Sequence, residues 1–445
     1  MTYSYSITQD LAWQTEAKWQ QPDTPFMSFD YWQALTDSGA IGQSAGWIPL
    51  YLQIYKVSKQ AETTDKVKTI EVESVETKSI NTEAVEEKSV EKEYRLIATM
   101  PLFIKGHHQG EYVFDHAWAE AYARYGEDYY PRLVTSVPYT PVMGQRLWLV
   151  EGEEITSAIW QTTIAAVDDV AKQVGASSWH GLFIESEQIA AAKQLPNPIF
   201  EHQLLERQGC QFLWQNQKLT EHEADSGPKA YTDFEDFLST LTAKKRKNIR
   251  AERKKIAKQN LSCRIKTGEE ITAQDWDVFY QCYAMTYAVR GRAPYLTPEF
   301  FEQIAQTMSE HIMLAQGLDD SGEIVASSLF FYDTPNQPNA TLFGRYWGAL
   351  EEYDSLHFEL CYYQGIEFAI QKGLQYFDPG TQGEHKLIRG FVPQKTHSLH
   401  RIYDARFEPA IANFCEQDNA YMQQYREQAH QALPFNIDNI PSFNG

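Results

Sequence analysis

The order of strand-like and helix-like segments in the second half of the chain constrains its fold more than any other feature. Three strand-like runs, IMLAQGL, EIVASSLFFYD and ATLFGRYWG, follow one another from residue 312 to residue 348. A helix-like segment at about 355–372 then leads to a short strand-like run, QYFDP. Strands joined by tight turns pair antiparallel, whereas a helical crossover joins parallel strands. The order therefore predicts an α/β (α+β) fold with mixed sheets, and ligands favour the point where the pairing changes.

The first half of the chain contains the same kinds of segment. Strand-like runs WIPLYLQIYKV and YRLIATMPLFIK precede a helix-like segment at about 153–174, and the strand-like run SWHGLFI follows it. Further helices are expected at about 197–208, 233–259, 272–289, 297–309 and 409–431. A chain of 445 residues is long enough for two or three domains. We predict an N-terminal domain at 1–220, a basic helical segment at 221–260 and a C-terminal domain at 261–445 with the active site.

One segment has a composition unlike the rest. Residues 59–93 contain no Gly, Pro or aromatic residue, and acidic residues outnumber lysines there. Such a segment buries too little apolar surface to offset the entropy lost on ordering, so it is predicted to be a disordered, low-complexity insert. It lies between two strand-like runs, which predicts an enlarged hairpin loop.

The charge and cysteine pattern limits the class of protein. The net charge is −21, so the chain as a whole should repel nucleic acid and anionic membranes. Its five cysteines are scattered without a CxxC pair, which indicates a reducing compartment and argues against a cysteine zinc site. The sequence shows neither a signal-peptide pattern nor a run of 18 apolar residues. We expect a cytoplasmic protein without stable membrane insertion.

Several long motifs resemble one known family. In the second half they are GRYWG, LHFELCYYQGIEFAI, QGEHK and RGFVP, and in the first half GWIPLYL, GEYVFDHAWAEAYARYG and VPYTPVMG. These motifs resemble the FemAB-like bacterial N-acyltransferases, which belong to the GNAT superfamily and are associated with peptidoglycan biosynthesis or recognition. The resemblance implies two tandem GNAT-like domains. It also implies amide formation between an activated acyl or aminoacyl donor and a primary amine, with a peptidoglycan precursor as a candidate acceptor.

Four residues are candidates for the general base of such a reaction. Glu384 and His385 lie in QGEHK, and His357 and Glu359 lie in LHFE. His357 falls in a first helical turn, where the helix dipole favours neutral imidazole, which accepts a proton from an amine. His357 and Glu359 are two residues apart, so both cannot face one cleft. Each histidine could instead be a hydrogen-bonded structural residue. No HExxH or comparable spacing is present, so no metal site is predicted.

A second group of residues has donors or backbone freedom suited to a substrate anion or carbonyl. The predicted substrate-binding residues are Arg345, Tyr346, Asp378, Gln382, Gly383, Lys386, Arg389, Arg290 and Arg292. Arg345 lies in a buried-looking strand and therefore needs a defined partner, either ligand or protein. The loop residues could equally form salt bridges among themselves, and Asp378 could merely cap a turn.

The loop before the helix at 355–372 bears on the donor. Acyl-CoA-dependent members of the resembled superfamily place a glycine-rich, pyrophosphate-binding loop there, whereas this chain has ALEEYDS. Its acids, Glu351, Glu352 and Asp354, would repel a pyrophosphate. Aminoacyl-tRNA therefore stands beside acyl-CoA as a candidate co-substrate, and no tightly bound cofactor is predicted.

A strongly basic stretch gives tRNA further support. Nine of the fifteen residues at 244–258 are Lys or Arg. The predicted nucleic-acid-binding residues are Lys244, Lys245, Arg246, Lys247, Arg250, Arg253 and Lys254. Two alternatives stay open, a solvated helix against the protein's own acidic surface and a site for anionic lipid. The alternative function for the whole protein is non-catalytic, with the GNAT fold binding a cell-wall or nucleic-acid ligand.

Overall fold

The computed structural model describes residues 2–11, 17–20, 24–57, 93–219, 229–381 and 383–443. The insert predicted at 59–93 lies outside the described residues except for Glu93, and Gln382 lies outside them as well. The predictions for these positions are therefore not addressed by the structure.

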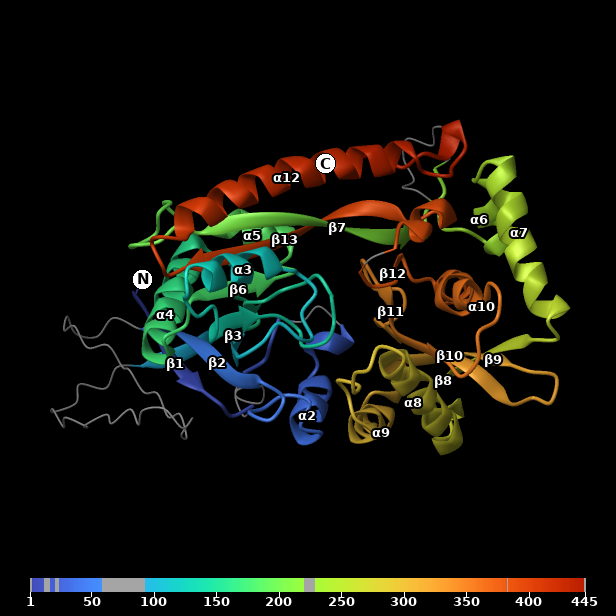
Figure 1. The fold of residues 1–445 in the computed structure, drawn as a ribbon, viewed down its shortest axis with the longest axis horizontal. Helices are drawn as coiled ribbons and strands as arrows, with labels where there is room; N and C mark the ends of the chain where they lie inside the picture. Colours follow the sequence, from blue (N-terminus) through green and yellow to red (C-terminus); the bar gives the residue numbers. More distant parts are fainter. Residues whose placement is uncertain are drawn as a thin grey trace.

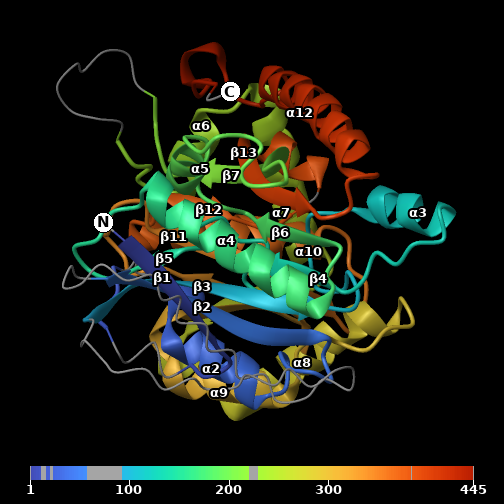
Figure 2. The same cartoon turned by 90° about the vertical axis from the view of Figure 1, so that its left-hand side faces the viewer.

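The N-terminal half is an antiparallel meander followed by one parallel step. The strands β1 (Thr2–Thr8), β2 (Trp47–Val57), β3 (Tyr94–Lys105) and β4 (Arg132–Thr135) pair antiparallel in that order. Helix α4 (Ser157–Val174) then crosses the sheet, as Figure 2 shows, and β6 (Ser178–Leu182) pairs with β4 in parallel. The Thr156 side chain caps the start of α4, and Gly175 ends it in a left-handed conformation. Shorter elements are α2 (Phe29–Asp37), α3 (His116–Arg124), β5 (Trp148–Leu149) and α5 (Ser186–Ala192).

The C-terminal half repeats this arrangement. The strands β8 (Ser262–Thr267), β9 (Ile312–Leu318), β10 (Ile324–Tyr332) and β11 (Thr341–Ala349) pair antiparallel in that order, and α8 (Ala273–Ala288) and α9 (Pro298–Thr307) connect β8 to β9. A helical run then crosses to β12 (Tyr376–Asp378), which pairs with β11 in parallel. This run consists of α10 (Leu356–Phe358), a π-helical turn (Glu359–Tyr363) and α11 (Gln364–Lys372). The predicted change from antiparallel to parallel pairing is confirmed.

The last strand of each half pairs with a strand of the other half. β7 (Leu205–Gln215) pairs with β12, and β13 (Val392–Ile402) pairs with both β6 and β7. The exchange joins the halves into one 13-stranded sheet, and α12 (Glu408–Gln431) runs along β7 and β13 (Figure 1). Two meanders, each with a helical crossover to a parallel strand, form the tandem GNAT-like fold with mixed sheets that the sequence predicts. That prediction is confirmed.

Aromatic side chains join the two halves on the side of the sheet that holds α2. The ring of Phe26 packs against Phe331 and Phe343 of the C-terminal half, with centroids 5.2 and 5.0 Å apart. The same face of β11 approaches α8 so closely that a Cβ atom on Gly348 would lie 1.7 Å from the Cys282 carbonyl oxygen. Only glycine allows this contact, which explains the second glycine of GRYWG.

Two helix predictions are wrong in detail. The helix expected at 197–208 is absent, because Ile199 and His202 form a β-bridge and β7 begins at Leu205. The helix expected at 233–259 is divided into α6 (Phe234–Ser239) and α7 (Ala243–Lys258). Between them Thr240 hydrogen-bonds to the Phe237 carbonyl and Leu241 is buried, so the chain turns. Within the described parts of the chain, no helix has the length and apolar character needed to cross a membrane.

Candidate active site

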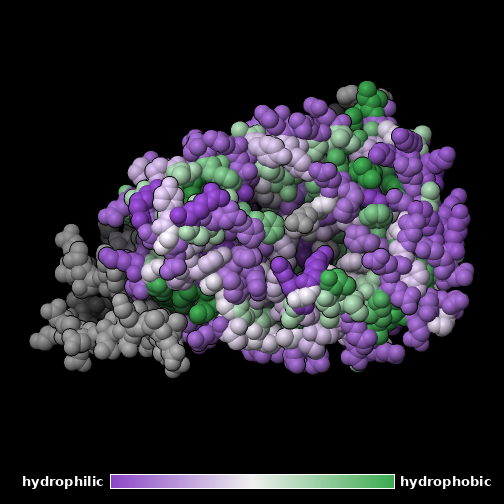
Figure 3. Space-filling view, in the orientation of Figure 1, coloured by the Kyte–Doolittle hydropathy of each residue, from purple (hydrophilic) through white to green (hydrophobic). Residues whose placement is uncertain are grey.

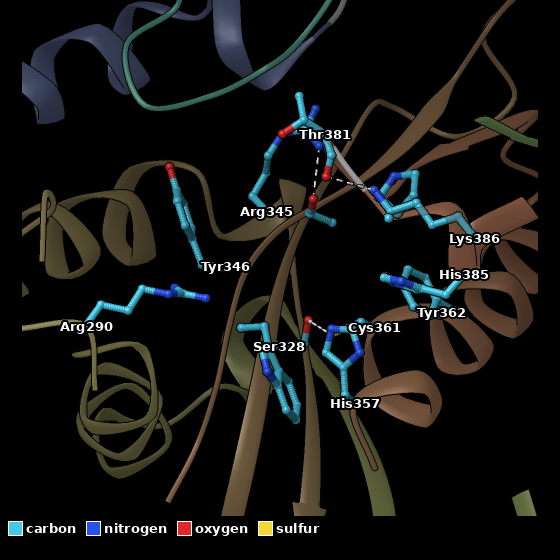
Figure 4. A pocket seen from close by; sticks show the side chains of 14 residues that line it. Arg290, Ser328, Arg345, Tyr346, His357, Cys361, Tyr362, Thr381, His385 and Lys386 are labelled. Atoms are coloured by element: carbon cyan, nitrogen blue, oxygen red, sulfur yellow. Dashed lines mark hydrogen bonds between the residues drawn. The ribbon is translucent and has the colours of Figure 1, made fainter. Parts of the chain in front are cut away.

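A pocket lies where the strands β11 and β12 diverge. β12 pairs with β11 only along Thr341–Phe343, although β11 continues to Ala349. The pairing of β11 with β10 skips one residue at Arg345, which is a β-bulge. Bulges redirect side chains and occur often beside active sites. The pocket has a volume of about 410 Å³, and its described lining is Arg290, Ser328, Gly344, Arg345, Tyr346, Trp347, His357, Cys361, Tyr362, Pro379, Thr381, Gly383, His385 and Lys386 (Figure 4).

The π-helical turn Glu359–Tyr363 shapes one wall of this pocket. Its wider i→i+5 hydrogen bonding changes the phase of the helix. His357, Cys361 and Tyr362 consequently line the pocket, while Glu359 points toward α7. Turns of this kind are frequent at functional sites. Figure 3 shows the surface of this side of the molecule, which is mostly hydrophilic and is hollowed near its middle.

His357 is held as a neutral imidazole. Burial, with smaller contributions from the neighbouring His385, Arg389 and Lys386, lowers the pKa of its side chain to about 4. Its ring packs against Trp347, with centroids 5.2 Å apart. A neutral imidazole in a pocket wall can accept a proton. The neutral form of His357 that the sequence predicts is therefore caused mainly by burial of the side chain.

His385 and Tyr362 form a hydrogen-bonded pair in the same wall. The Tyr362 hydroxyl lies 2.7 Å from Nε2 of His385. Burial, followed by the charges of Arg389 and Lys386, lowers the pKa of His385, and burial raises the pKa of Tyr362. Tyr362 is therefore a neutral phenol and His385 a neutral imidazole, and the ring nitrogen of His385 that carries the proton decides which of the two donates.

Two cations lie at the end of the pocket near β12. The Arg345 guanidinium donates to Oδ2 of Asp378 at 2.7 Å and to the Asp378 carbonyl oxygen, which supplies the protein partner that its burial requires. The Lys386 ammonium donates to the carbonyl oxygens of Gly380 at 2.7 Å and Thr381 at 3.1 Å. Burial lowers the pKa of Lys386 to about 8. No Asp or Glu is among the described lining residues, so the pocket has a positive potential.

The structure thus brings together part of the predicted site. The predicted residues that line the pocket are His357, His385, Arg345, Tyr346, Gly383, Lys386 and Arg290. Asp378 stands behind Arg345 and also accepts a hydrogen bond from the Gly380 backbone.

Four predicted residues lie elsewhere. Glu359 is buried and forms an ion pair with Arg253 at 2.9 Å. Arg389 contacts Glu252 at 2.8 Å and the Tyr363 hydroxyl at 2.9 Å, and neither partner lines the pocket. Glu384 is exposed near Tyr425, and Arg292 is exposed outside the lining.

Sequence reasoning missed Tyr362 and Cys361. Ideal helical geometry does not place both in the wall with His357, and the π-helical turn that does so has no recognisable sequence signal. Burial raises the pKa of Cys361 to about 12, so its thiol stays protonated and is a poor nucleophile. Among the described residues no group of three or more His, Cys, Asp or Glu is placed to hold a metal ion.

Three arginines of the basic helix α7 form ion pairs or hydrogen bonds with other residues of the protein. Arg253 pairs with Glu359 and Glu367, Arg250 pairs with Glu235, and Arg246 donates to the Ser239 and Leu241 carbonyls. The exposed lysines that share one face of α7 and form no ion pair with any described residue are Lys244, Lys247, Lys254 and Lys258. We call these four the lysine stripe. Lys245 is half-buried and lies off that face.

The fold and the pocket at its parallel step define a GNAT-like protein. A family model described as peptidoglycan biosynthesis/recognition, FemAB-like, matches residues 76–437. The chain therefore belongs to the FemAB-like family.

Solved structures with a similar fold include L-PGS from Bacillus licheniformis, at 11% identity, covering 73% of this chain and 86% of that one, with a TM-score of 0.42. A tandem GNAT protein from the clavulanic acid biosynthesis pathway is 10% identical, covers 90% and 98% of the two chains and has a TM-score of 0.40. Saccharomyces cerevisiae N-myristoyltransferase with bound myristoyl-CoA is 13% identical over 61% and 59%, with a TM-score of 0.32. No curated protein matches this chain.

Proposed function

We propose that the protein is an N-acyltransferase that forms an amide between an activated acyl or aminoacyl donor and a primary amine. The observation that carries this proposal is the neutral imidazole of His357 in a positively charged pocket where β11 and β12 diverge. Acyl transfer to an amine needs a free-base amine, a proton acceptor and donors for the developing oxyanion. The described lining contains a group suited to each requirement.

The positive lining assists the amine before it reacts. A bound ammonium would lie near Lys386 and Arg290, and like charges favour its deprotonated form. His357 then accepts the proton that the nitrogen loses as it attacks the donor carbonyl. Correct placement of the two reactants supplies much of the remaining acceleration.

A negative charge develops on the carbonyl oxygen of the donor during the attack. The Lys386 ammonium is placed to stabilise the carbonyl oxygen as it becomes negative. With Nε2–H of His385 donating to its oxygen, the Tyr362 hydroxyl can give its own proton to the leaving group, which balances the proton that His357 takes from the amine. No covalent enzyme intermediate is needed, in agreement with the protonated thiol of Cys361.

The donor and acceptor belong to the proposal as well. The family description supports a peptidoglycan precursor as the acceptor. Acyl-CoA and aminoacyl-tRNA are the two candidate donors. The lysine stripe supports tRNA. The acidic loop before α10 disfavours the pyrophosphate of acyl-CoA, since Glu351 and Glu352 are exposed there; Asp354 of the same loop pairs with Lys255 at 2.9 Å. We assign the chemistry to the proposed C-terminal domain at 261–445, with the domain at 1–220 beside it.

The test is a transfer assay with purified protein, acyl-CoA or charged tRNA, and a panel of primary amines, with the amide detected by mass spectrometry. H357Q should lower the rate by about 10² or more, the usual contribution of a general base. H116Q, which changes an exposed histidine outside the pocket lining, is the matched control. Equal rates for the wild type and H357Q would refute the assigned role.

A non-catalytic binding role is the second candidate, because the family description names recognition beside biosynthesis. A binding protein would capture a muropeptide or RNA without turnover. Native mass spectrometry of freshly purified protein identifies such a ligand directly. An enzyme and a binding protein then differ in whether the ligand is converted when a donor is added.

A further inference from the structure

Among the described residues, the cationic side chains of the pocket lining outnumber the carboxylates that form ion pairs with them. Arg290, Arg345 and Lys386 are the lining residues with cationic side chains, aside from two histidines whose pKa values are lowered. Asp378 neutralises Arg345 at 2.7 Å. Lys386 donates to carbonyl oxygens, and Arg290 forms no ion pair with any described residue. Arg290 and Lys386 therefore have no carboxylate at ion-pair distance among the described residues.

Arg290 has the most free hydrogen-bonding capacity of these groups. It follows α8 directly, is exposed, and donates one hydrogen bond to the Thr286 carbonyl oxygen at 3.2 Å. A guanidinium carries five N–H donors, so most of them remain available. Figure 4 shows its side chain reaching into the cavity from the wall opposite Lys386 and His385. Its planar fork matches the oxygen pairs of a carboxylate or a phosphate.

We propose that the pocket takes an amine acceptor whose own molecule carries an anionic group, a carboxylate or a phosphate, and that Arg290 binds this anion. The inference rests on the proposed function for the identity of the acceptor. A cavity of about 410 Å³ equals the liquid volume of roughly a dozen waters. An amine near His357 and an anion at Arg290 would thus occupy one cavity, which favours a small molecule that carries both groups.

The charge balance explains why such a molecule is preferred. A simple amine arrives as an ammonium ion and is repelled by Arg290 and Lys386. A molecule with both charges is attracted through its anion, which then holds the amine among cations that favour its free base. The same two lining residues therefore select the substrate and prepare its nitrogen for attack.

The test uses matched pairs of small amines that differ in one anionic group. Lysine is compared with cadaverine for the carboxylate, and phosphoethanolamine with ethanolamine for the phosphate. Binding to the full-length protein is measured by calorimetry, independently of any transfer reaction, and inorganic phosphate serves as a competitor. The anionic member of at least one pair should bind tighter by about tenfold or more, the value of one charge-assisted hydrogen bond. The pair with the larger ratio identifies the anion.

The variant R290Q tests whether Arg290 causes the preference for anionic amines. Arg290 is exposed, so the substitution should not disturb folding, and the ratio between anionic and neutral amines should fall toward one. R292Q is the matched control, since Arg292 is exposed near Arg290 but is not among the lining residues, and its ratio should equal that of the wild type. Equal binding of anionic and neutral amines, or an unchanged ratio in R290Q, overturns the inference. Binding with this preference but without transfer to any donor would instead refute the proposed function and leave the anion site standing.

Discussion

The hydroxyl of Tyr362 lies 2.7 Å from Nε2 of His385, which joins the π-helical turn to the loop after β12 across the wall of the pocket. The pair comes from segments 23 residues apart. Because burial raises the pKa of the tyrosine and lowers that of the histidine, the proton stays on the phenol at neutral pH. The pocket wall therefore presents a neutral proton donor rather than a charged one.

Removing this hydroxyl should affect catalysis more than folding. Y362F should lower the transfer rate by about 10-fold to 10³-fold with little change in KM, because the proton for the leaving group is lost. The missing hydrogen bond should cost about 1 kcal/mol of unfolding free energy, measured by chemical denaturation. Y425F is the control, since the Tyr425 hydroxyl donates to the exposed Glu384 at 3.5 Å and Tyr425 is not among the described lining residues of the pocket. A rate loss in Y425F equal to that in Y362F would show that the effect is not specific to the pair.

His357 should give the enzyme an unusually acidic pH limit. The pKa of its side chain is about 4 in the folded protein, compared with about 6.5 for an ordinary histidine. The base form is thus present throughout the neutral range, and kcat/KM should fall only as the pH drops toward 4. A rate profile with its acidic limb centred near 6.5 in folded protein would contradict the assignment of His357 as the base.

The same lowered pKa predicts a change in stability. Between pH 6.5 and 4 the unfolded chain binds a proton at residue 357 that the folded protein excludes, so the free energy of unfolding must fall as the pH falls through this window. The loss from this residue should reach about 3 kcal/mol near pH 4. Between pH 7 and pH 4.5, H357Q should lose about 2.4 kcal/mol less of its unfolding free energy than the wild type, as measured by denaturation at the two pH values. Parallel pH profiles for the two proteins would disagree with this.

The sequence predicted the fold more fully than the site because the two depend on different signals. The three strands before the helix at 355–372, and the short strand after it, follow from local patterns and standard connection rules. The exchange of β7 and β13 between the halves could not be predicted, since a strand pattern does not identify its neighbour. Pairing partners are set by long-range packing, for which a single sequence carries no signal.

The site shows the same limit residue by residue. His357 and His385 were identified because titratable residues in loops and first helical turns are conspicuous in a sequence. Glu359 looked equally suitable, but its partner Arg253 comes from a helix more than 100 residues away. Tyr362 was not singled out in the sequence, and it lines the pocket from within the π-helical turn. A residue's chemistry can thus be read from its type, whereas its direction depends on contacts that the sequence leaves open.

Glu359 should matter for stability rather than for the chemical step. Its carboxylate is buried against Arg253, which also pairs with Glu367. E359Q leaves the arginine with one carboxylate, and should lower the unfolding free energy by roughly 2 kcal/mol, somewhat less than the loss of an only partner. E384Q is the matched control, because Glu384 is exposed and its substitution should leave stability unchanged. A large rate loss in E359Q at full stability would instead place this carboxylate in the reaction.

The lysine stripe should govern the salt dependence of tRNA binding. Lys244, Lys247, Lys254 and Lys258 are exposed on one face of α7 and have no carboxylate partner among the described residues. Each contact with a phosphate releases counterions, so changing all four to glutamine should reduce the slope of log K against log salt by about 3. The control changes four exposed lysines outside α7, Lys18, Lys172, Lys193 and Lys372, and alters the net charge equally. Filter binding across a salt series separates the two cases. An equal loss of slope in both variants would mean that overall charge, and not α7, attracts the RNA.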